Sequence, residues 1–159
     1  MRIGVQTWGS EGDVRPFVAL AAGLHRAGHQ VTLEYVSVEG RDWAPMCRKL
    51  GFEGRGVAVD TIRKARMAMG DKVQALLGKG NAIAQVEAIM AGLMDPGVEE
   101  MWESALALAS RSDLVVAHVL HHPSVTAALA RKVPVVGIFT APVTPTRALP
   151  PMGLPDLGW

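Results

Sequence analysis

The sequence WGSEGDVRP (residues 8–16) joins an apolar segment to an apolar helix. The segment before it, RIGVQT (residues 2–7), is a short apolar run that predicts a buried strand. The segment after it, residues 16–27, carries its apolar side chains at helical spacing, and Gly28 then predicts the end of that helix. A strand, a glycine-bearing loop and a helix in this order are the usual opening of an α/β fold.

Strands and helices alternate along most of the chain, which predicts a Rossmann-like, doubly wound parallel sheet. The segment 61–72 interrupts this rhythm, because it is basic, bears methionines and shows no clear strand. Asp95 is the expected N-cap of a late helix, with Pro96 at its first position. The remaining expected strands are 29–36, 54–59, 112–119 and 133–140, and the expected helices are 40–50, 73–94, 95–111 and 123–132.

Composition excludes several classes of protein. A net charge of +1 over 159 residues gives no basic surface for nucleic acid, and 49% hydrophobic residues suit one globular domain. The single cysteine, Cys47, excludes an internal disulfide and is expected to be a buried thiol. No signal peptide and no apolar run of 18 residues is present, so we expect a soluble, cytoplasmic protein.

The end of the chain has the composition of a linker. Residues 140–159 hold five of the ten prolines and show neither helical nor strand period. We therefore expect a domain over residues 1–147 and the start of a Pro/Gly-rich linker over 148–159, with the natural protein continuing beyond it.

The loop after the first strand is the candidate functional site, because ligands of open parallel sheets bind at the carboxyl ends of the strands. It is neither a dinucleotide fingerprint nor a P-loop, since only Gly9 and Gly12 are present and no Gly-Lys-Ser/Thr follows. The two glycines and Ser10 nevertheless allow a tight turn that presents N–H groups to an anion or a sugar hydroxyl. Asp13 has two open interpretations, a helix N-cap or a catalytic base.

The run GSEGDVRPFVALAAGLHRAGHQVTL (residues 9–33) resembles the opening of glycosyltransferase family 1, in its sterol and antibiotic-aglycone branch. That opening reads G-[ST]-R-G-D-[VI]-x-P, followed by a helix ending in AGH and a strand. The chain departs from it at Glu11, where relatives usually carry arginine. Residues 113–147 resemble the last helix and strand of the same domain and its Thr/Pro-rich segment. The matching positions in the first run are Gly9, Ser10, Gly12, Asp13, Val14, Pro16, Ala19, Leu20, Leu24, Ala27, Gly28, His29 and Val31.

The resemblance implies the N-terminal half of a GT-B fold, which binds the acceptor, while a C-terminal domain missing here binds the sugar donor. It implies an inverting enzyme without metal or cofactor, using a UDP- or dTDP-linked sugar and a sterol, polyketide or similar acceptor. Asp13 takes the role of base, and the chain alone is expected to be inactive. Residues implied at the donor and acceptor loops are Gly9, Ser10, Gly12, Thr140, Pro142 and Thr144.

Three histidines, His118, His121 and His122, follow the fourth expected strand and therefore reach the same sheet edge. They are candidates to hold the base or to bind the acceptor; the alternative is that they are solvent-exposed loop residues. Their spacing alone does not favour a metal site.

The segment 61–111 offers two further alternatives. Its methionines either belong to ordinary helix cores or line an apolar acceptor cleft. Its basic run is either a mobile, solvated loop or a contact with anionic lipid. The residues concerned are Met67, Met69, Met90, Met94 and Met101 in the first group and Arg63, Lys64 and Arg66 in the second.

A different function class also fits the same pattern. A non-catalytic Rossmann-like module, which binds a small molecule or a partner protein, needs Asp13 only as a helix cap. The glycosyltransferase interpretation instead needs a donor-binding domain after residue 159.

Overall fold

The structure is a computed structural model that describes residues 1–70 and 82–140, with backbone only at Ala82 and Ile83. Five parallel strands form one sheet in the order β3-β2-β1-β4-β5. This confirms the predicted doubly wound α/β sheet. The strands are β1 (Arg2–Gly9), β2 (Gln30–Ser37), β3 (Glu53–Gly56), β4 (Leu114–His118) and β5 (Val135–Ile138).

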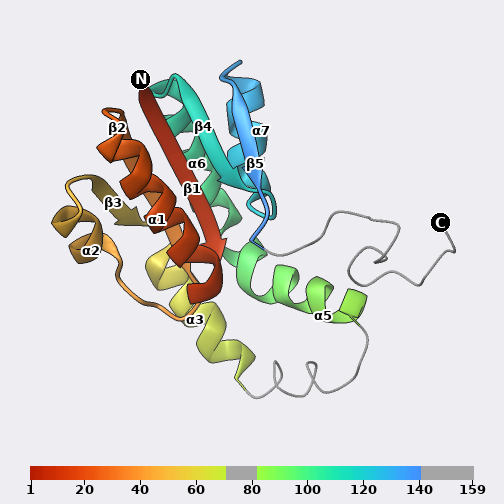
Figure 1. Ribbon diagram of the computed structural model, residues 1–159. Helices are drawn as coiled ribbons and strands as arrows, with labels where there is room; N and C mark the ends of the chain where they lie inside the picture. The colour runs from red at the N-terminus through yellow and green to blue at the C-terminus, as the bar shows by residue number, and fades with distance from the viewer. Residues whose placement is uncertain (71–81, 141–159) are drawn as a thin grey trace, which may run out of the picture.

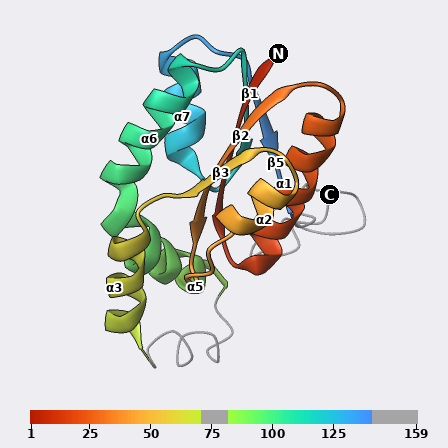
Figure 2. The same cartoon turned by 90° about the vertical axis from the view of Figure 1, so that its left-hand side faces the viewer.

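Helices cover both faces of the sheet (Figures 1 and 2). In Figure 2 the strands stand between α1 and α2 on one side and α3, α6 and α7 on the other. The helices are α1 (Glu11–Arg26), α2 (Ala44–Lys49), α3 (Val59–Met69), α5 (Ala82–Ile89), α6 (Val98–Ser110) and α7 (His122–Ala130). A π-helical turn (Met90–Met94) and a 3-10 turn (Asp95–Gly97) link α5 to α6. The molecule is therefore a three-layer α/β sandwich.

Helix α1 begins five residues earlier than the expected start at residue 16. Ser10 is its N-cap, so Pro16 lies inside the helix and cannot donate a hydrogen bond to the carbonyl four residues before it. The Asp13 carboxylate accepts hydrogen bonds from the N–H and the hydroxyl of Ser10, which stabilises the helix start and offsets that loss. Gly28 has φ of +87° just beyond the last residue of α1, which confirms its predicted role at the end of the helix.

The segment between β3 and β4 differs most from expectation. Residues 61–69, where the sequence shows no clear strand, belong to α3, which begins at Val59 within the segment expected to be a strand. The helix expected over 95–111 instead begins at Val98 with Gly97 as its N-cap, so the prediction that Asp95 caps it is wrong. Part of the helix expected over 73–94 lies outside the described residues, as does the expected domain boundary at residue 147.

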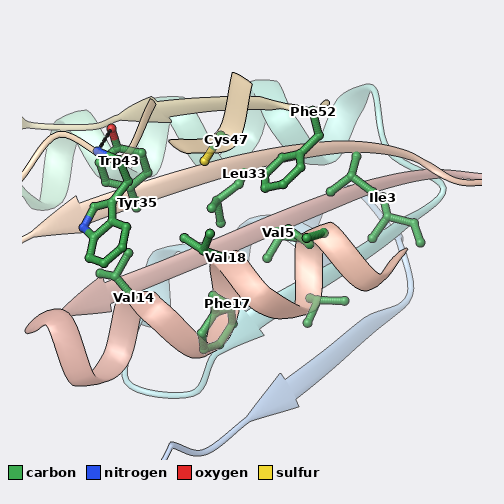
Figure 3. Close-up of a cluster of buried hydrophobic side chains, with 14 residues drawn as sticks. Ile3, Val5, Val14, Phe17, Val18, Leu33, Tyr35, Trp43, Cys47 and Phe52 are labelled. Atoms are coloured by element: carbon green, nitrogen blue, oxygen red, sulfur yellow. Dashed lines mark hydrogen bonds between the residues drawn. The ribbon is translucent and has the colours of Figure 1, made fainter. Parts of the chain in front are cut away.

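The face of the sheet under α1 is an apolar core (Figure 3). Alternate residues of β1 and β2, such as Val5 and Leu33, pack against Phe17 and Val18 of α1. Burying one such side chain fully stabilises the fold by about 1.5–3 kcal/mol. Cys47 of α2 joins this cluster as a buried free thiol, as predicted, and burial raises its pKa to about 11.

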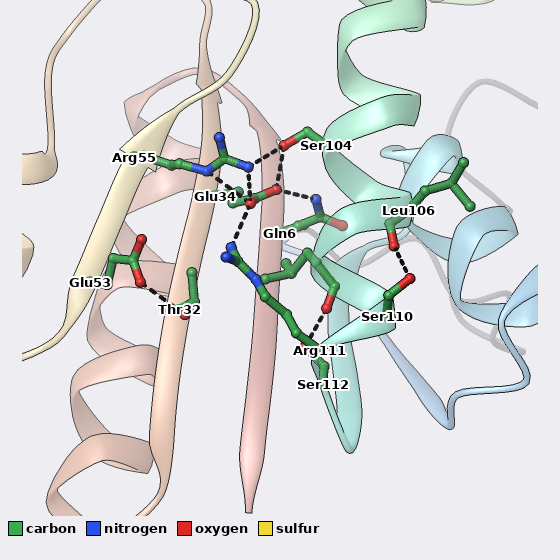
Figure 4. A network of polar contacts seen from close by, with 11 residues as sticks. Gln6, Thr32, Glu34, Glu53, Arg55, Ser104, Leu106, Ser110, Arg111 and Ser112 are labelled. Atoms are coloured by element: carbon green, nitrogen blue, oxygen red, sulfur yellow. Dashed lines mark hydrogen bonds and ion pairs between the residues drawn. The ribbon is translucent and has the colours of Figure 1, made fainter.

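The opposite face of the sheet carries a buried charge instead (Figure 4). Glu34 of β2 is only 1% exposed, and its carboxylate accepts hydrogen bonds from Gln6 Nε2 (2.8 Å) and Ser104 Oγ (2.6 Å). Arg55 donates from Nε and Nη2 at 2.9 and 2.5 Å, and Arg111 donates at 3.3 Å. Three strands and α6 are thus joined through one carboxylate.

Replacing Glu34 by alanine is expected to lower the free energy of unfolding by about 2–4 kcal/mol, because the buried Gln6 amide and the partly buried Ser104 hydroxyl lose a charged partner. Arg55 and Arg111 are half-exposed, so water can solvate them in the variant. The loss of stability is therefore smaller than it would be if a buried charge were left without a partner. Urea denaturation measures the difference. Glu53→Ala, at an exposed position of β3, is the matched control and is expected to change stability by less than about 0.5 kcal/mol. Equal effects of the two substitutions would contradict the role given to the Glu34 network.

Candidate active site

The candidate site lies where the chain leaves adjacent strands in opposite directions. Strands β1 and β4 are neighbours in the sheet; β1 continues into α1 on one face, and β4 leads into α7 on the other (Figure 1). This is the topological switch point of a doubly wound sheet, where ligands bind outside the carboxyl ends of the strands. The loop GSEGDV leaves β1 at this edge, as the sequence predicts.

Gly9 shapes the beginning of the loop. Its φ of +138° is strained for any residue with a side chain, and a Cβ there would lie 2.3 Å from Asp13 Oδ2. The prediction that Gly12 also serves a tight turn is not confirmed, since Gly12 lies within α1 and has no positive φ. Gly9 therefore makes room for the Asp13 carboxylate.

Asp13 is not the N-cap that one interpretation of the sequence proposed. Ser10 is the N-cap, and Asp13 is the third residue of α1, where its Oδ2 accepts hydrogen bonds from the N–H and the hydroxyl of Ser10, both at 2.9 Å. This is the position of the acidic residue of a capping box. The carboxylate thus stabilises the helix start through one oxygen only.

The other oxygen of Asp13 faces the neighbouring strands. Thr140, just after β5, donates its hydroxyl to Asp13 Oδ1 at 2.8 Å. His118, the last residue of β4, has its Nε2 3.0 Å from Thr140 Oγ1 and 3.6 Å from Asp13 Oδ1. Residues at the carboxyl ends of β1, β4 and β5 therefore converge on a single carboxylate, that of Asp13, whose side chain remains 30% exposed.

His118 is a buried, neutral member of this group. Its side chain is 4% exposed, its ring packs against Phe17 at a centroid distance of 5.8 Å, and Leu120 N–H donates to its Nδ1 at 3.2 Å. Burial lowers the pKa of His118, and the nearby charge of Asp13 opposes that shift without overcoming it. His118 therefore contacts Asp13 as a polar neighbour and not as an ion pair at neutral pH.

The other two histidines separate in the structure. His121, the N-cap residue of α7, is buried, and its Nδ1 is hydrogen-bonded to Ser124 Oγ; His122 is exposed at the first position of α7. The interpretation of all three as exposed loop residues is therefore wrong for His118 and His121. Burial, with smaller contributions from His122 and His118, lowers the pKa of His121 to about 3. The buried His121 supports the β4–α7 turn.

Acidification is expected to destabilise the fold through His121. Between pH 6.5 and about 3 the unfolded chain binds a proton at this side chain that the folded chain does not, so stability falls as pH falls, by at most about 1.4 kcal/mol per pH unit. In His121→Gln, which has no such proton to bind, this contribution disappears. Urea denaturation from pH 7 to 4 is expected to show the wild-type advantage over His121→Gln shrinking; a constant difference would contradict the assignment.

Glu11, where the chain departs from the family pattern, has a clear structural partner. Its carboxylate pairs with Arg15 at 2.9 Å and with Arg41 at 2.8 Å, and the guanidinium of Arg41 lies 4.2 Å from the ring centroid of Trp43. The hydrogen bond from Arg41 lowers the pKa of Glu11. The ion pair between Glu11 and Arg41 connects the start of α1 to the β2–α2 loop. These residues are 30 positions apart, and the sequence contains no signal for their contact.

Arg41 also borders a pocket at the same sheet edge. The pocket has a volume of about 340 Å³, opens beside the carboxyl ends of β2 and β3, and includes Tyr35, Asp42 and Val59 in its lining. A larger hollow of about 480 Å³ lies around His25 and Phe52, beside the amino end of β2. The smaller of these two pockets is connected to the candidate site, because Arg41 in its lining pairs with Glu11 at the start of α1.

The methionines and the basic run mostly have structural roles. Met94 and Met101 are fully buried in a cluster around Trp8, with Met69 and Met90 packed against it, while Met67 is exposed. This favours the helix-core interpretation over an open cleft for the buried residues. The basic residues lie on α3 and not in a loop: Arg63 pairs with Asp60, and Arg66 donates to the carbonyl of Glu39. Lipid contact stays a prediction.

Within residues 1–70 and 82–140, no three His, Cys, Asp or Glu side chains are placed to hold a metal ion. None of the helices in the same ranges is long and apolar enough to cross a bilayer. Two residues expected at the acceptor loop, Pro142 and Thr144, lie outside the described residues.

Sequence comparison finds relatives among enzymes that transfer sugars, although no family model matches the chain. A sterol 3-beta-glucosyltransferase of Arabidopsis thaliana is 26% identical over 157 residues, which cover 94% of this chain and 24% of that protein. The O-mycaminosyltylonolide 6-deoxyallosyltransferase of Streptomyces fradiae is 32% identical over 152 residues, covering 94% of this chain and 33% of that protein. The chain thus spans a third or less of these relatives.

Solved structures show the same fold. The glycosyltransferase SsfS6 of Streptomyces sp. SF2575 superposes with a TM-score of 0.58 at 26% identity, over 86% of this chain and 38% of that one. The same enzyme complexed with thymidine diphosphate gives a TM-score of 0.57 at 23% identity, over the same shares of the two chains. In each case the chain thus covers well under half of the solved protein.

Proposed function

We propose that the chain is the acceptor-binding domain of an inverting glycosyltransferase of family 1, the N-terminal half of a GT-B enzyme. The complete enzyme moves a sugar from a nucleotide-sugar donor to a hydroxyl of a lipophilic or polycyclic acceptor. The donor binds to a second domain that follows this one. The reaction needs neither a metal ion nor a further cofactor.

The observation that carries this proposal is the Asp13 carboxylate at the switch point. One of its oxygens is held by Ser10 and the other by Thr140, and the side chain is still accessible from outside. In an inverting transfer, the acceptor oxygen attacks the anomeric carbon as the bond from that carbon to the nucleotide diphosphate breaks. The acceptor must lose its proton in that step, so a general base within about 2.6–3.2 Å of the hydroxyl is required, and the Asp13 carboxylate can serve as that base.

Acceptor and donor classes are proposed from the relatives. The relatives act on sterols and on a macrolide, which supports a polycyclic or macrocyclic hydroxyl as acceptor. The thymidine diphosphate complex of the solved neighbour supports a dTDP- or UDP-linked sugar as co-substrate, bound by the second domain. On this chain the acceptor lies beside Asp13 and extends toward the pocket near Arg41. His122, exposed beside the same strand edge, is an acceptor contact in this proposal.

Sugar transfer by the complete natural protein tests the proposal. UDP-glucose and a dTDP-linked deoxysugar are offered with a sterol and with a macrolide aglycone, and the product is detected by mass spectrometry. The anomeric configuration, read by NMR, is expected to be inverted relative to the donor, and chelation by EDTA is expected to leave the rate unchanged. The 159-residue chain alone is expected to transfer nothing.

Three results would contradict the proposal in different ways. Retention of configuration would exclude a single displacement with Asp13 as base. Transfer by the 159-residue chain alone would show that no second domain is needed. Binding of acceptor without transfer by the complete protein would favour the non-catalytic module.

A further inference from the structure

We propose that Thr140 and His118 are positioning residues which hold Oδ1 of Asp13 and leave one lone pair of that oxygen for the acceptor hydroxyl. This inference rests on the proposed function and assigns roles within the same site. For Thr140 it differs from the expectation drawn from the sequence, in which this residue binds the acceptor; for His118 it favours one of the two expected roles, holding the base, over contact with the acceptor. Its basis is the direction of each hydrogen bond around the carboxylate.

The direction of the bond at Asp13 is fixed by its charge. An ionised carboxylate only accepts hydrogen bonds, so the Thr140 hydroxyl must donate its single proton to Asp13 Oδ1. Thr140 Oγ1 then has only lone pairs to offer to its other neighbour. His118 Nε2, 3.0 Å away, must therefore be the donor in that contact.

The other ring nitrogen of His118 gives the same answer independently. Leu120 N–H points at Nδ1 at 3.2 Å, so Nδ1 accepts and carries no proton. A neutral imidazole with an unprotonated Nδ1 carries its proton on Nε2. Both contacts thus assign one tautomer, and the chain of donors runs from Leu120 through His118 and Thr140 to Asp13.

This polarity excludes His118 as a base for the reaction. Its Nε2 already carries a proton, and its Nδ1 is occupied by Leu120 N–H. A proton taken from the acceptor therefore stays on Asp13 during transfer. His118, packed against Phe17, instead fixes the Thr140 hydroxyl so that it points at the carboxylate.

The count of lone pairs shows where the acceptor approaches. A carboxylate has about four acceptor sites, two on each oxygen. Oδ2 uses both of its sites on the N–H and the hydroxyl of Ser10. Oδ1 uses one on Thr140, so its second site is the one left for the acceptor hydroxyl.

Kinetics of Thr140 variants in the complete enzyme test this assignment. Thr140→Val keeps the shape of the side chain and removes the donor, and it is expected to lower kcat by about 10- to 100-fold with the KM for the acceptor unchanged. Thr140→Ser is expected to restore kcat. In the Asp13→Asn background, Thr140→Val is expected to add little further loss, because it acts through Asp13.

His118 is tested by two matched substitutions and by its spectrum. His118→Gln retains an N–H donor near the Nε2 position and is expected to keep more activity than His118→Phe, which retains only the ring. Nitrogen-15 NMR of the wild-type protein at neutral pH is expected to show a neutral ring protonated on Nε2. The NMR experiment needs no variant and no turnover.

Each other outcome overturns the assignment. A raised KM for the acceptor with unchanged kcat in Thr140→Val would make Thr140 an acceptor contact, and unchanged kinetics would give it no role. A His118 ring that is charged or protonated on Nδ1 would break the chain of donors. Failure of the proposed function itself is distinguishable, because it removes transfer in the wild type while the NMR result still reports on the hydrogen bonds.

Discussion

Replacing Asp13 by asparagine in the complete enzyme is expected to lower kcat by about 10²–10⁴-fold, the usual contribution of a general base. Asparagine has nearly the same shape, and its side-chain oxygen can still accept a hydrogen bond from Ser10, so the start of α1 is preserved. The loss therefore reports on proton transfer and not on folding. Steady-state kinetics with saturating donor and acceptor measure it.

Glu11→Gln is the matched control for this substitution. Glu11 lies two residues earlier on the same turn of α1, but it is paired with arginines and not with groups at the switch point. Its replacement is expected to leave kcat close to the wild-type value. Near-wild-type transfer by Asp13→Asn would remove Asp13 from the role of base, and comparable losses in both variants would point to a general effect of charge in the loop.

Replacing Gly9 by alanine is expected to be the second most damaging change, with kcat lowered by about 10²-fold or more, because displacing a catalytic group by about 1 Å has effects of that size. A Cβ at Gly9 would lie 2.3 Å from Asp13 Oδ2, so the carboxylate must move away from Ser10. The backbone is strained as well, since φ is +138°. Activity and thermal unfolding are measured on the same preparation.

Gly28→Ala separates these two effects. Gly28 also has a positive φ, +87°, but a Cβ there meets nothing within 4 Å. It is expected to cost roughly 1 kcal/mol of stability from backbone strain alone and to leave kcat unchanged. If Gly9→Ala lowers stability but leaves kcat unchanged, then glycine at position 9 is not needed to keep the Asp13 carboxylate in its catalytic position.

The fold could be predicted from sequence where local signals are strong. The apolar run of β1, the helical spacing after it and Gly28 each follow from local chemistry, so the α/β architecture was accessible. The start of α1 could not be predicted in this way, because Pro16 is typical of the first turn of a helix. The contacts between Ser10 and Asp13 that begin α1 lie before it in the sequence. A capping box can outweigh a proline inside a helix.

The site could be predicted only in part, because its key contacts join distant residues. Asp13 was accessible from its motif, His118 from the expectation that strand ends share one edge, and Thr140 only from the family resemblance. The hydrogen bond between Thr140 and Asp13 spans 127 residues and leaves no local pattern. The burial of Glu34 has no local signal either. A charged residue within an apolar strand is expected from hydropathy to face solvent, but Glu34 is buried.

The role of Asp13 as the base is tested most directly by the position of a bound acceptor relative to its carboxylate. In a crystal structure of the complete enzyme with its acceptor, the reacting hydroxyl is predicted to lie about 2.6–3.2 Å from Asp13 Oδ1, the distance required for proton abstraction. Thr140 is predicted to remain on the same oxygen. A reacting hydroxyl held by another acidic or basic side chain, with Asp13 bonded only to Ser10 and Thr140, would show that Asp13 is not the base.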